Sequence, residues 1–69
     1  MTIAKVLEVL AEGHSIEGAI QSAVSEAAET VRDIRHVYVE GVQAIVEDNE
    51  VVKYRVNAKI TFLVETERD

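Results

Sequence analysis

The sequence predicts an α+β fold in the order β-α-β-β, with a three-stranded antiparallel sheet packed on one amphipathic helix. Three observations lead to this prediction. The chain has 69 residues, which suits one small domain over residues 1–69. Apolar residues recur every three or four positions in one segment and at alternate positions in the last two segments. No proline interrupts any of these segments.

Residues 3–10 are predicted to form the first strand, because they are mostly aliphatic and β-branched. Residues 11–14 combine glycine with polar residues, which predicts a loop after this strand. His14 lies in this predicted loop, where we expect its side chain to face solvent.

A helix is predicted to begin after Ser15, which is a suitable N-cap residue. Glu17 complements the positive end of this helix, and Arg32 and Arg35 are expected at its negative end. No glycine marks where the helix stops. The apolar positions that define its buried face are Ile16, Ala19, Ile20, Ala23, Val24, Ala27, Val31 and Ile34.

From His36 onward the apolar residues alternate, which predicts a strand, and the alternation changes phase at Gly41. A glycine at a change of phase indicates a β-bulge. Residues 48–50 form a polar turn in which Asn49 can adopt a left-handed conformation. A hairpin is therefore expected to join this strand to the next one.

The clearest alternation lies in residues 52–64, which predicts the last strand, and residues 65–69 are expected to form an acidic, frayed tail. Strands of roughly 12 to 14 residues are long compared with the usual 5 or 6. We expect a sheet of this length to extend beyond its single helix, so that part of its apolar face and its edges need another subunit. The apolar face of the last strand comprises Val52, Tyr54, Val56, Ala58, Ile60, Phe62 and Val64.

Composition and charge limit the classes of function. The chain has no cysteine and two histidines, so it cannot build an ordinary structural zinc site alone. A net charge of -6 disfavours binding to nucleic acid or to an anionic membrane. The N-terminal segment is too short and too charged for a signal peptide or a membrane span, so a cytoplasmic protein is expected. The expected partners are copies of the same chain and small molecules.

Three of the seven basic residues, Lys53, Arg55 and Lys59, alternate along one face of the last strand. They are expected to form an ion-pair network with Glu8, Glu40 or another carboxylate of a neighbouring strand or subunit. An anion-binding site is the alternative, and the network is favoured because charge ladders on exposed sheet surfaces are common.

His36 lies where the chain passes from the helix to the strand. It is interpreted either as a ligand-contacting or metal-ligating side chain or as a partly buried histidine at a bend, and the second reading is favoured. Carboxylates near the turn at Asp48 and Glu50 suit a hard cation such as calcium, but no dense calcium loop is present, so the metal ligands stay unassigned. No catalytic constellation is present, and the chain is not expected to be an enzyme.

The β-α-β-β order and several short motifs together resemble the dodecins, small proteins that assemble into hollow homododecamers. The resemblance implies a shell of 23 symmetry and flavin binding, with riboflavin or its nucleotide FMN held in pairs near a two-fold axis between tryptophans and glutamines. The residues that carry the resemblance are Lys5-Val6-Leu7, Ser15, Ala19, Ala27, Thr30-Val31, Val39 and the run from Tyr54 to Phe62.

In this resemblance the tryptophan position falls at His36 and the glutamine position at Arg55, so these two residues are the implied ligand contacts. Leu10-Ala11-Glu12 replaces the glycine-threonine-serine turn of the family. An imidazole is a smaller stacking partner than an indole, which weakens the expectation of flavin. The expected function is small-ligand binding and storage in a dodecameric shell. The alternative is a purely structural or divalent-cation-binding dodecin without flavin.

Overall fold

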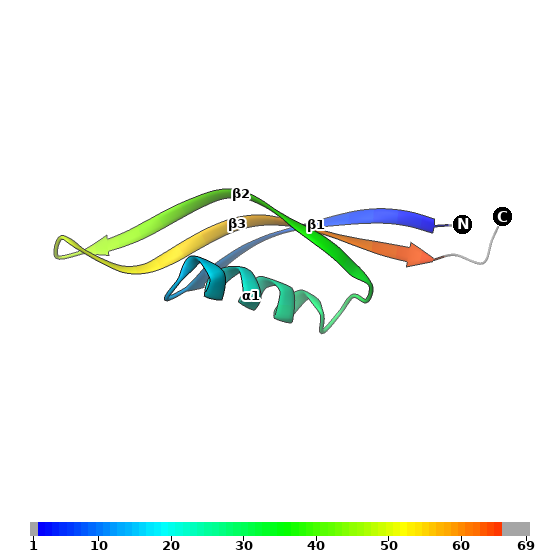
Figure 1. Cartoon of the computed structure of the whole chain (residues 1–69), viewed down its shortest axis with the longest axis horizontal. Coiled ribbons are helices and arrows are strands. Elements are labelled where there is room, and N and C mark those ends of the chain that lie inside the picture. Colours follow the sequence, from blue (N-terminus) through cyan, green and yellow to red (C-terminus); the bar gives the residue numbers. More distant parts are fainter. Residues whose placement is uncertain (1, 66–69) are drawn as a thin grey trace.

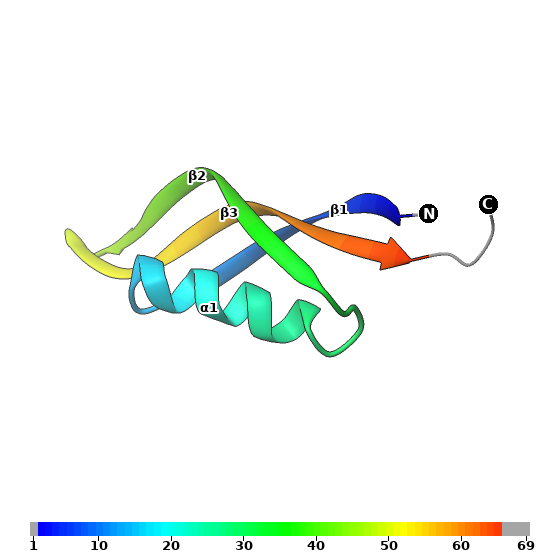
Figure 2. The same ribbon diagram turned by 45° about the vertical axis from the view of Figure 1, so that its right-hand side comes forward.

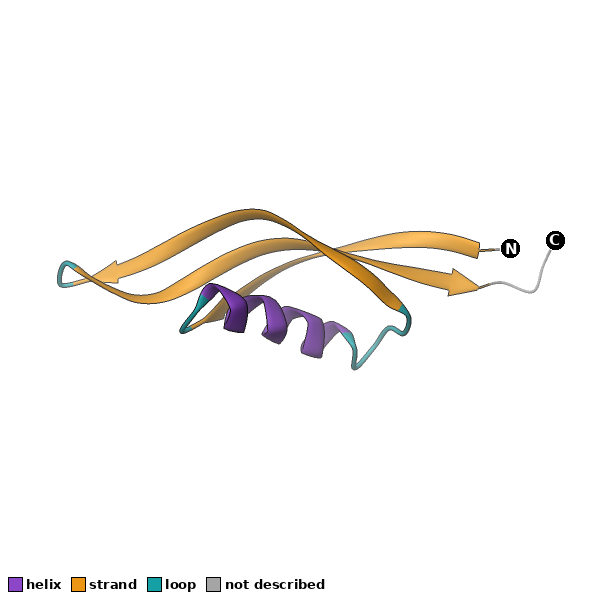
Figure 3. Cartoon of the chain, viewed as in Figure 1, coloured by secondary structure: helices purple, strands orange, loops and turns teal. Residues whose placement is uncertain are grey.

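The computed structural model describes residues 2–65 and confirms the predicted β-α-β-β fold (Figures 1 and 3). The elements are β1 (Thr2–Gly13), α1 (Ile16–Ala27), β2 (Ile34–Glu47) and β3 (Glu50–Glu65). The strands form one antiparallel sheet in the order β1-β3-β2. The last strand in the chain is therefore the central strand of the sheet.

The sheet is a long, twisted ribbon, and the molecule measures 57 × 19 × 13 Å along its principal axes. α1 lies against one face of this ribbon, and the β2–β3 hairpin extends past one end of the helix (Figures 1 and 2). A helix of 12 residues is only about 18 Å long. It therefore covers the middle of the sheet and leaves both ends uncovered. Across residues 2–65, no helix has the length and hydropathy needed to span a bilayer.

The buried core of the described residues is small and lies between α1 and β3. Ala19, Ala23 and Ala27 are spaced four apart, so they share one face of α1. They pack on Val56, Ala58 and Ile60, and none of these six residues is more than 4% exposed. Many larger apolar side chains stay exposed in the single chain: Ile3, Val6, Leu7, Leu10, Ile16, Tyr38, Val42, Val46, Val51 and Val52.

The connection from β1 to α1 is short and tightly packed. The Ser15 hydroxyl oxygen accepts a hydrogen bond from the Gly18 amide at 2.9 Å, which confirms Ser15 as the N-cap. Gly13 lies so close to α1 that a Cβ atom there would be 2.8 Å from the Ala19 nitrogen. A glycine is therefore required at Gly13 for the helix to reach its place on the sheet.

The predicted loop at residues 11–14 is wrong for its first three residues, which belong to β1. Glu12 pairs with Arg55 and Gly13 pairs with Tyr54 in the ladder with β3. Glycine and polar residues locally favour a loop. Here the long neighbouring strand β3 supplies backbone hydrogen bonds that keep these residues in β1.

The sequence left the end of the helix open, and α1 ends at Ala27, so Val31 and Ile34 lie beyond the helix although the predicted buried face included them. The Thr30 amide donates to the Ala27 carbonyl at 3.0 Å, so the chain tightens into a turn. Asp33 then adopts a left-handed conformation with φ of 60°. Val31 and Ile34 still pack on the core from outside the helix, which explains why the apolar spacing continues past its true end.

Arg32 and Arg35 were predicted at the negative end of the helix, but α1 ends at Ala27, before either of them. The last turn of α1 contains no basic residue. The Arg35 guanidinium instead contacts the Asp33 carboxylate, with an Nε to Oδ1 distance of 3.2 Å. Both side chains are more than half exposed, so this pair contributes little to stability.

The predicted bulge at Gly41 is confirmed by a shift in the β2–β3 register between Val39 and Gly41. Asn49 is left-handed as predicted, with φ of 66°, and Asp48 is too, with φ of 53°. Two left-handed residues form a two-residue hairpin turn whose twist matches the strands. The turn is thus shorter than predicted, because Glu50 belongs to β3 and pairs with Glu47.

The predicted acidic tail begins one residue too early. Glu65 is the last residue of β3 and pairs with Thr2. The rest of the predicted tail, residues 66–69, lies outside the described residues.

Candidate functional site

The three cations of the last strand and His36 lie on the sheet face that α1 does not cover, which we call the open face. Alternate residues of β3 are buried under α1, so the residues between them point to the other side. The strand register places residues of β1 and β2 beside them. The open face thus includes Leu10, Glu12, His36, Tyr38, Gln43, Lys53, Arg55, Asn57 and Lys59.

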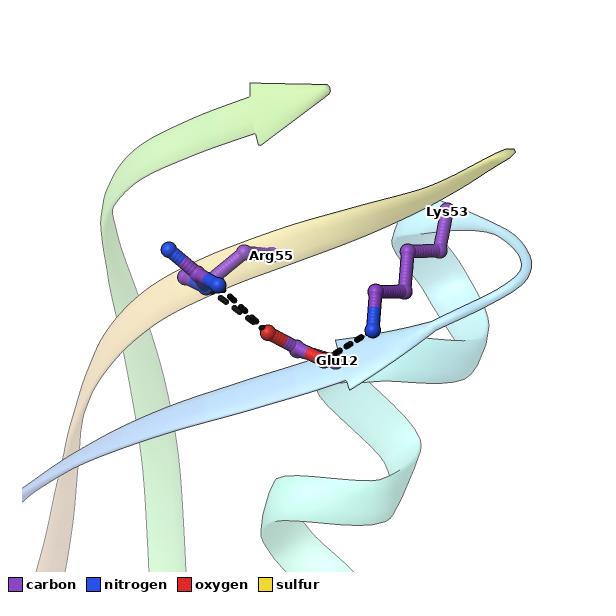
Figure 4. Close-up of polar contacts among 3 residues, drawn as sticks. All are labelled: Glu12, Lys53 and Arg55. Carbon is purple, nitrogen blue, oxygen red and sulfur yellow. Dashed lines mark hydrogen bonds and ion pairs between the residues drawn. The ribbon is translucent and has the colours of Figure 1, made fainter. Parts of the chain in front are cut away.

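One carboxylate from β1 bridges two cations from β3 on the open face (Figure 4). The Glu12 Oε1 atom is 2.9 Å from Lys53 Nζ, and Oε2 is 2.7 Å from Arg55 Nη2. Arg55 Nε also donates a hydrogen bond to Oε2 at 2.9 Å. Both cations are thus held by a single side chain of the neighbouring strand.

The predicted ion-pair network is therefore present within one chain. Lys59 Nζ lies 3.3 Å from Glu40 Oε2, which confirms the predicted pairing of Lys59 with Glu40. The carboxylate that holds Lys53 and Arg55 is Glu12, which the sequence placed in a loop. Only the register that sets Glu12 opposite Arg55 reveals this contact.

The cluster lowers the pKa of Glu12 below its ordinary value of 4.5. The hydrogen bond from Lys53 is the largest cause, followed by the one from Arg55, and the positive charges of both residues add to the effect. Desolvation of the carboxylate opposes the shift, and it is weaker than either hydrogen bond but stronger than the charge effect of either cation alone. Glu12 is therefore ionised at neutral pH and stays ionised to lower pH than a free glutamate.

The lowered pKa of Glu12 predicts that part of the stability is lost in acid. A carboxyl group with a lower pKa in the folded state stabilises the fold above its unfolded pKa, and this contribution disappears as pH falls through the folded value. The thermal unfolding midpoint of the wild type should therefore fall more between pH 6 and pH 3.5 than that of Glu12→Gln. Equal falls in the two proteins would contradict this prediction.

The two residues implied as ligand contacts are not brought together within one chain. His36 pairs with Thr61 and Arg55 pairs with Gln43, so the two positions are six residues apart along β3. At about 3.3 Å per residue this separation is about 20 Å. The reading of His36 as a partly buried residue is wrong for the single chain, since its side chain is exposed, and His14 is exposed as predicted.

Several hollows border these residues, and sequence reasoning identified none of them. One, of about 400 Å³, lies between β1 and α1 and is lined by Leu7 and Leu10 on one side and Ser22 and Glu26 on the other. A second, of about 340 Å³, lies on the open face beside Arg55. Within residues 2–65, no three histidine, aspartate or glutamate side chains gather closely enough to hold a metal ion.

The architecture defines a small α+β protein in which a three-stranded antiparallel sheet holds one helix. The Dodecin family model matches residues 3–65, and the chain belongs to the Dodecin family. This finding confirms the resemblance seen in the sequence.

Solved structures share the fold over nearly their whole length. The tt0972 protein from Thermus thermophilus has a TM-score of 0.88 at 24% identity, covering 96% of this chain and 98% of that one. Dodecin from Streptomyces coelicolor has a TM-score of 0.87 at 27% identity, covering 96% of each chain. Dodecin from Streptomyces davaonensis has a TM-score of 0.86 at 17% identity, covering 94% of this chain and 97% of that one. A comparison with curated protein sequences gave no match.

Proposed function

We propose that this chain is the subunit of a hollow homododecameric shell that binds and stores a small ligand without chemical turnover. Membership of the Dodecin family supports the proposal. The observation that carries it is an imbalance within residues 2–65, where six buried residues form the core and ten large apolar side chains are exposed. A domain of about this size buries only about 60% of its unfolded surface, so contacts with other copies would supply the missing burial.

His36 and Arg55 are the proposed ligand contacts. Because they lie about 20 Å apart along the sheet, one small ligand cannot reach both in the same subunit. We place the ligand between subunits, where His36 of one chain can approach Arg55 of another. This arrangement couples ligand binding to assembly.

Dilution tests the proposed assembly. If each subunit is completed by its neighbours, folding and association are linked, and the thermal unfolding midpoint should rise with protein concentration. Light scattering measured on the same samples should give the mass of a dodecamer. Compact, folded monomers that persist at nanomolar concentration would contradict the proposal.

Flavin is the ligand that the family suggests, and a second candidate function is a shell that takes no flavin. A specific contact favours this second candidate: two nitrogen atoms of Arg55 are already engaged by Glu12. The imidazole of His36 also offers less stacking surface than an indole.

The double variant His36→Trp, Arg55→Gln separates the two candidates. It restores the stacking and amide groups implied for flavin, and stacking is worth about 0.5–1.5 kcal/mol per aromatic contact. Two such contacts across an axis should raise riboflavin affinity roughly tenfold or more, measured by quenching of flavin fluorescence. Arg55→Gln alone is the control. No gain in the double variant would show that the flavin site is absent.

A shell without flavin could hold a divalent cation, and calcium suits the carboxylate oxygens of this acidic chain. Since residues 2–65 of one chain form no metal cluster, the cation would be shared between subunits. Metal analysis of the purified protein, followed by thermal unfolding with and without a chelator, tests this form of the proposal. An unchanged midpoint would argue against a stabilising cation.

A further inference from the structure

We propose that Glu12 determines which ligands bind in the hollow of about 340 Å³ beside Arg55, which we call the open-face pocket. Glu12 excludes anionic groups, so that this pocket takes an uncharged ligand. The inference rests on the proposed function, because it specifies the charge of the ligand that this pocket would store. It concerns a residue that neither the sequence nor the family resemblance assigned to ligand binding.

The pocket itself carries one formal charge among the described residues that line it, the guanidinium of Arg55. The amide side chains of Gln43 and Asn57 can each donate and accept hydrogen bonds. Leu10 adds an apolar surface, with 69% of the residue exposed. The full lining is Leu10, Gly41, Val42, Gln43, Arg55 and Asn57. Amides beside an apolar surface suit a polar but uncharged molecule.

Glu12 compensates the one charge of this pocket. Arg55 directs both Nε and Nη2 toward a single Glu12 oxygen, at 2.9 and 2.7 Å, so two of its five donors are occupied. A phosphate or carboxylate that approached the same nitrogens would face the Glu12 carboxylate directly. Like charges at such close range oppose binding strongly.

The neighbouring cation, Lys53, cannot replace Arg55 as a binding partner for an incoming anion. Lys53 lies on the same carboxylate, 2.9 Å from Glu12 Oε1, and does not line the pocket. The chain as a whole carries a net charge of -6, which adds to the repulsion of anions. Removal of the Glu12 charge would leave Lys53 and Arg55 side by side with no carboxylate between them, which is the arrangement that binds a phosphate group.

Calorimetric titration of the intact assembly with inorganic pyrophosphate tests the inference. Glu12→Gln should bind pyrophosphate roughly tenfold or more tightly than the wild type, because it frees two converging cations. Glu40→Gln is the matched control: it makes the same change in net charge on the same face, but it releases the single cation Lys59. Its affinity should stay close to that of the wild type.

Two further variants make the test decisive. Glu12→Ser should show the same gain as Glu12→Gln, and adding Arg55→Gln to either variant should remove the gain. An equal gain in pyrophosphate affinity in Glu40→Gln would mean that the change in net charge alone causes the effect, and it would overturn the inference. Tight, Arg55-dependent binding of pyrophosphate by the wild type would overturn it too, as would no gain in either Glu12 variant. Light scattering of each variant separates these outcomes from a failure of the proposed assembly.

Discussion

Truncating Ile60 to alanine should lower the free energy of unfolding by about 2–5 kcal/mol. Ile60 is fully buried on β3 and packs with Ala23 and Ala27 of α1. The alanines opposite it are too short to fill the cavity that the substitution leaves. The measurement is urea unfolding at one fixed chain concentration, because dilution alone changes the stability of an assembling protein.

Ile60→Val is the control for this prediction, since it removes one methylene group at the same site. Its cost should be about 0.5–1.5 kcal/mol. If the alanine variant unfolds at the same urea concentration as the valine variant, Ile60 does not anchor the core of the subunit.

Replacing Gly13 with alanine should destabilise the protein by about 1–3 kcal/mol, as overpacked sites do. The new Cβ would lie 2.8 Å from the nitrogen and 3.1 Å from the Cα of Ala19, and both atoms belong to the backbone of α1. A side chain could rotate away from such a contact, but a helix backbone must shift as a unit. The helix would then lose its fit on Val56 and Ala58.

Gly41→Ala provides the comparison, because no atom lies within 4 Å of a Cβ built at Gly41. Gly41 also has no positive φ angle, so alanine fits its backbone without strain. Urea unfolding should place Gly41→Ala near the wild type and Gly13→Ala well below it. Equal midpoints for the two variants would refute the claim that close approach fixes glycine at Gly13.

The existence and order of the elements could be predicted because the spacing of apolar residues indicates which side of a helix or strand is buried. The boundaries could not, since contacts distant in sequence decide them. Val31 and Ile34 keep the helical spacing although the chain has left the helix, because the loop and the first residue of β2 return to the same apolar layer. Glu12 and Gly13 look like loop residues and are held in a strand by β3.

The candidate site was predictable to a similar degree. The alternation of polar and apolar residues was enough to place Lys53, Arg55 and Lys59 on one face of the last strand. The predicted pairing of Lys59 with Glu40 is present in the structure. Glu12 was missed because strand register cannot be read from composition, and its contact with Arg55 spans 43 positions in the sequence. The pockets were missed for the same reason, since their walls come from elements that are distant in the sequence.

The position of β3 in the sheet has a consequence for how the chain is made. β1 and β2 pair with β3 and not with each other, and β3 is the last strand to be synthesised. A nascent chain that has not yet exposed any of residues 50–65 can form neither backbone ladder. The complete sheet can therefore form only after residues 50–65 have been synthesised, and until then the apolar segments of β1 lack the strand on which they pair.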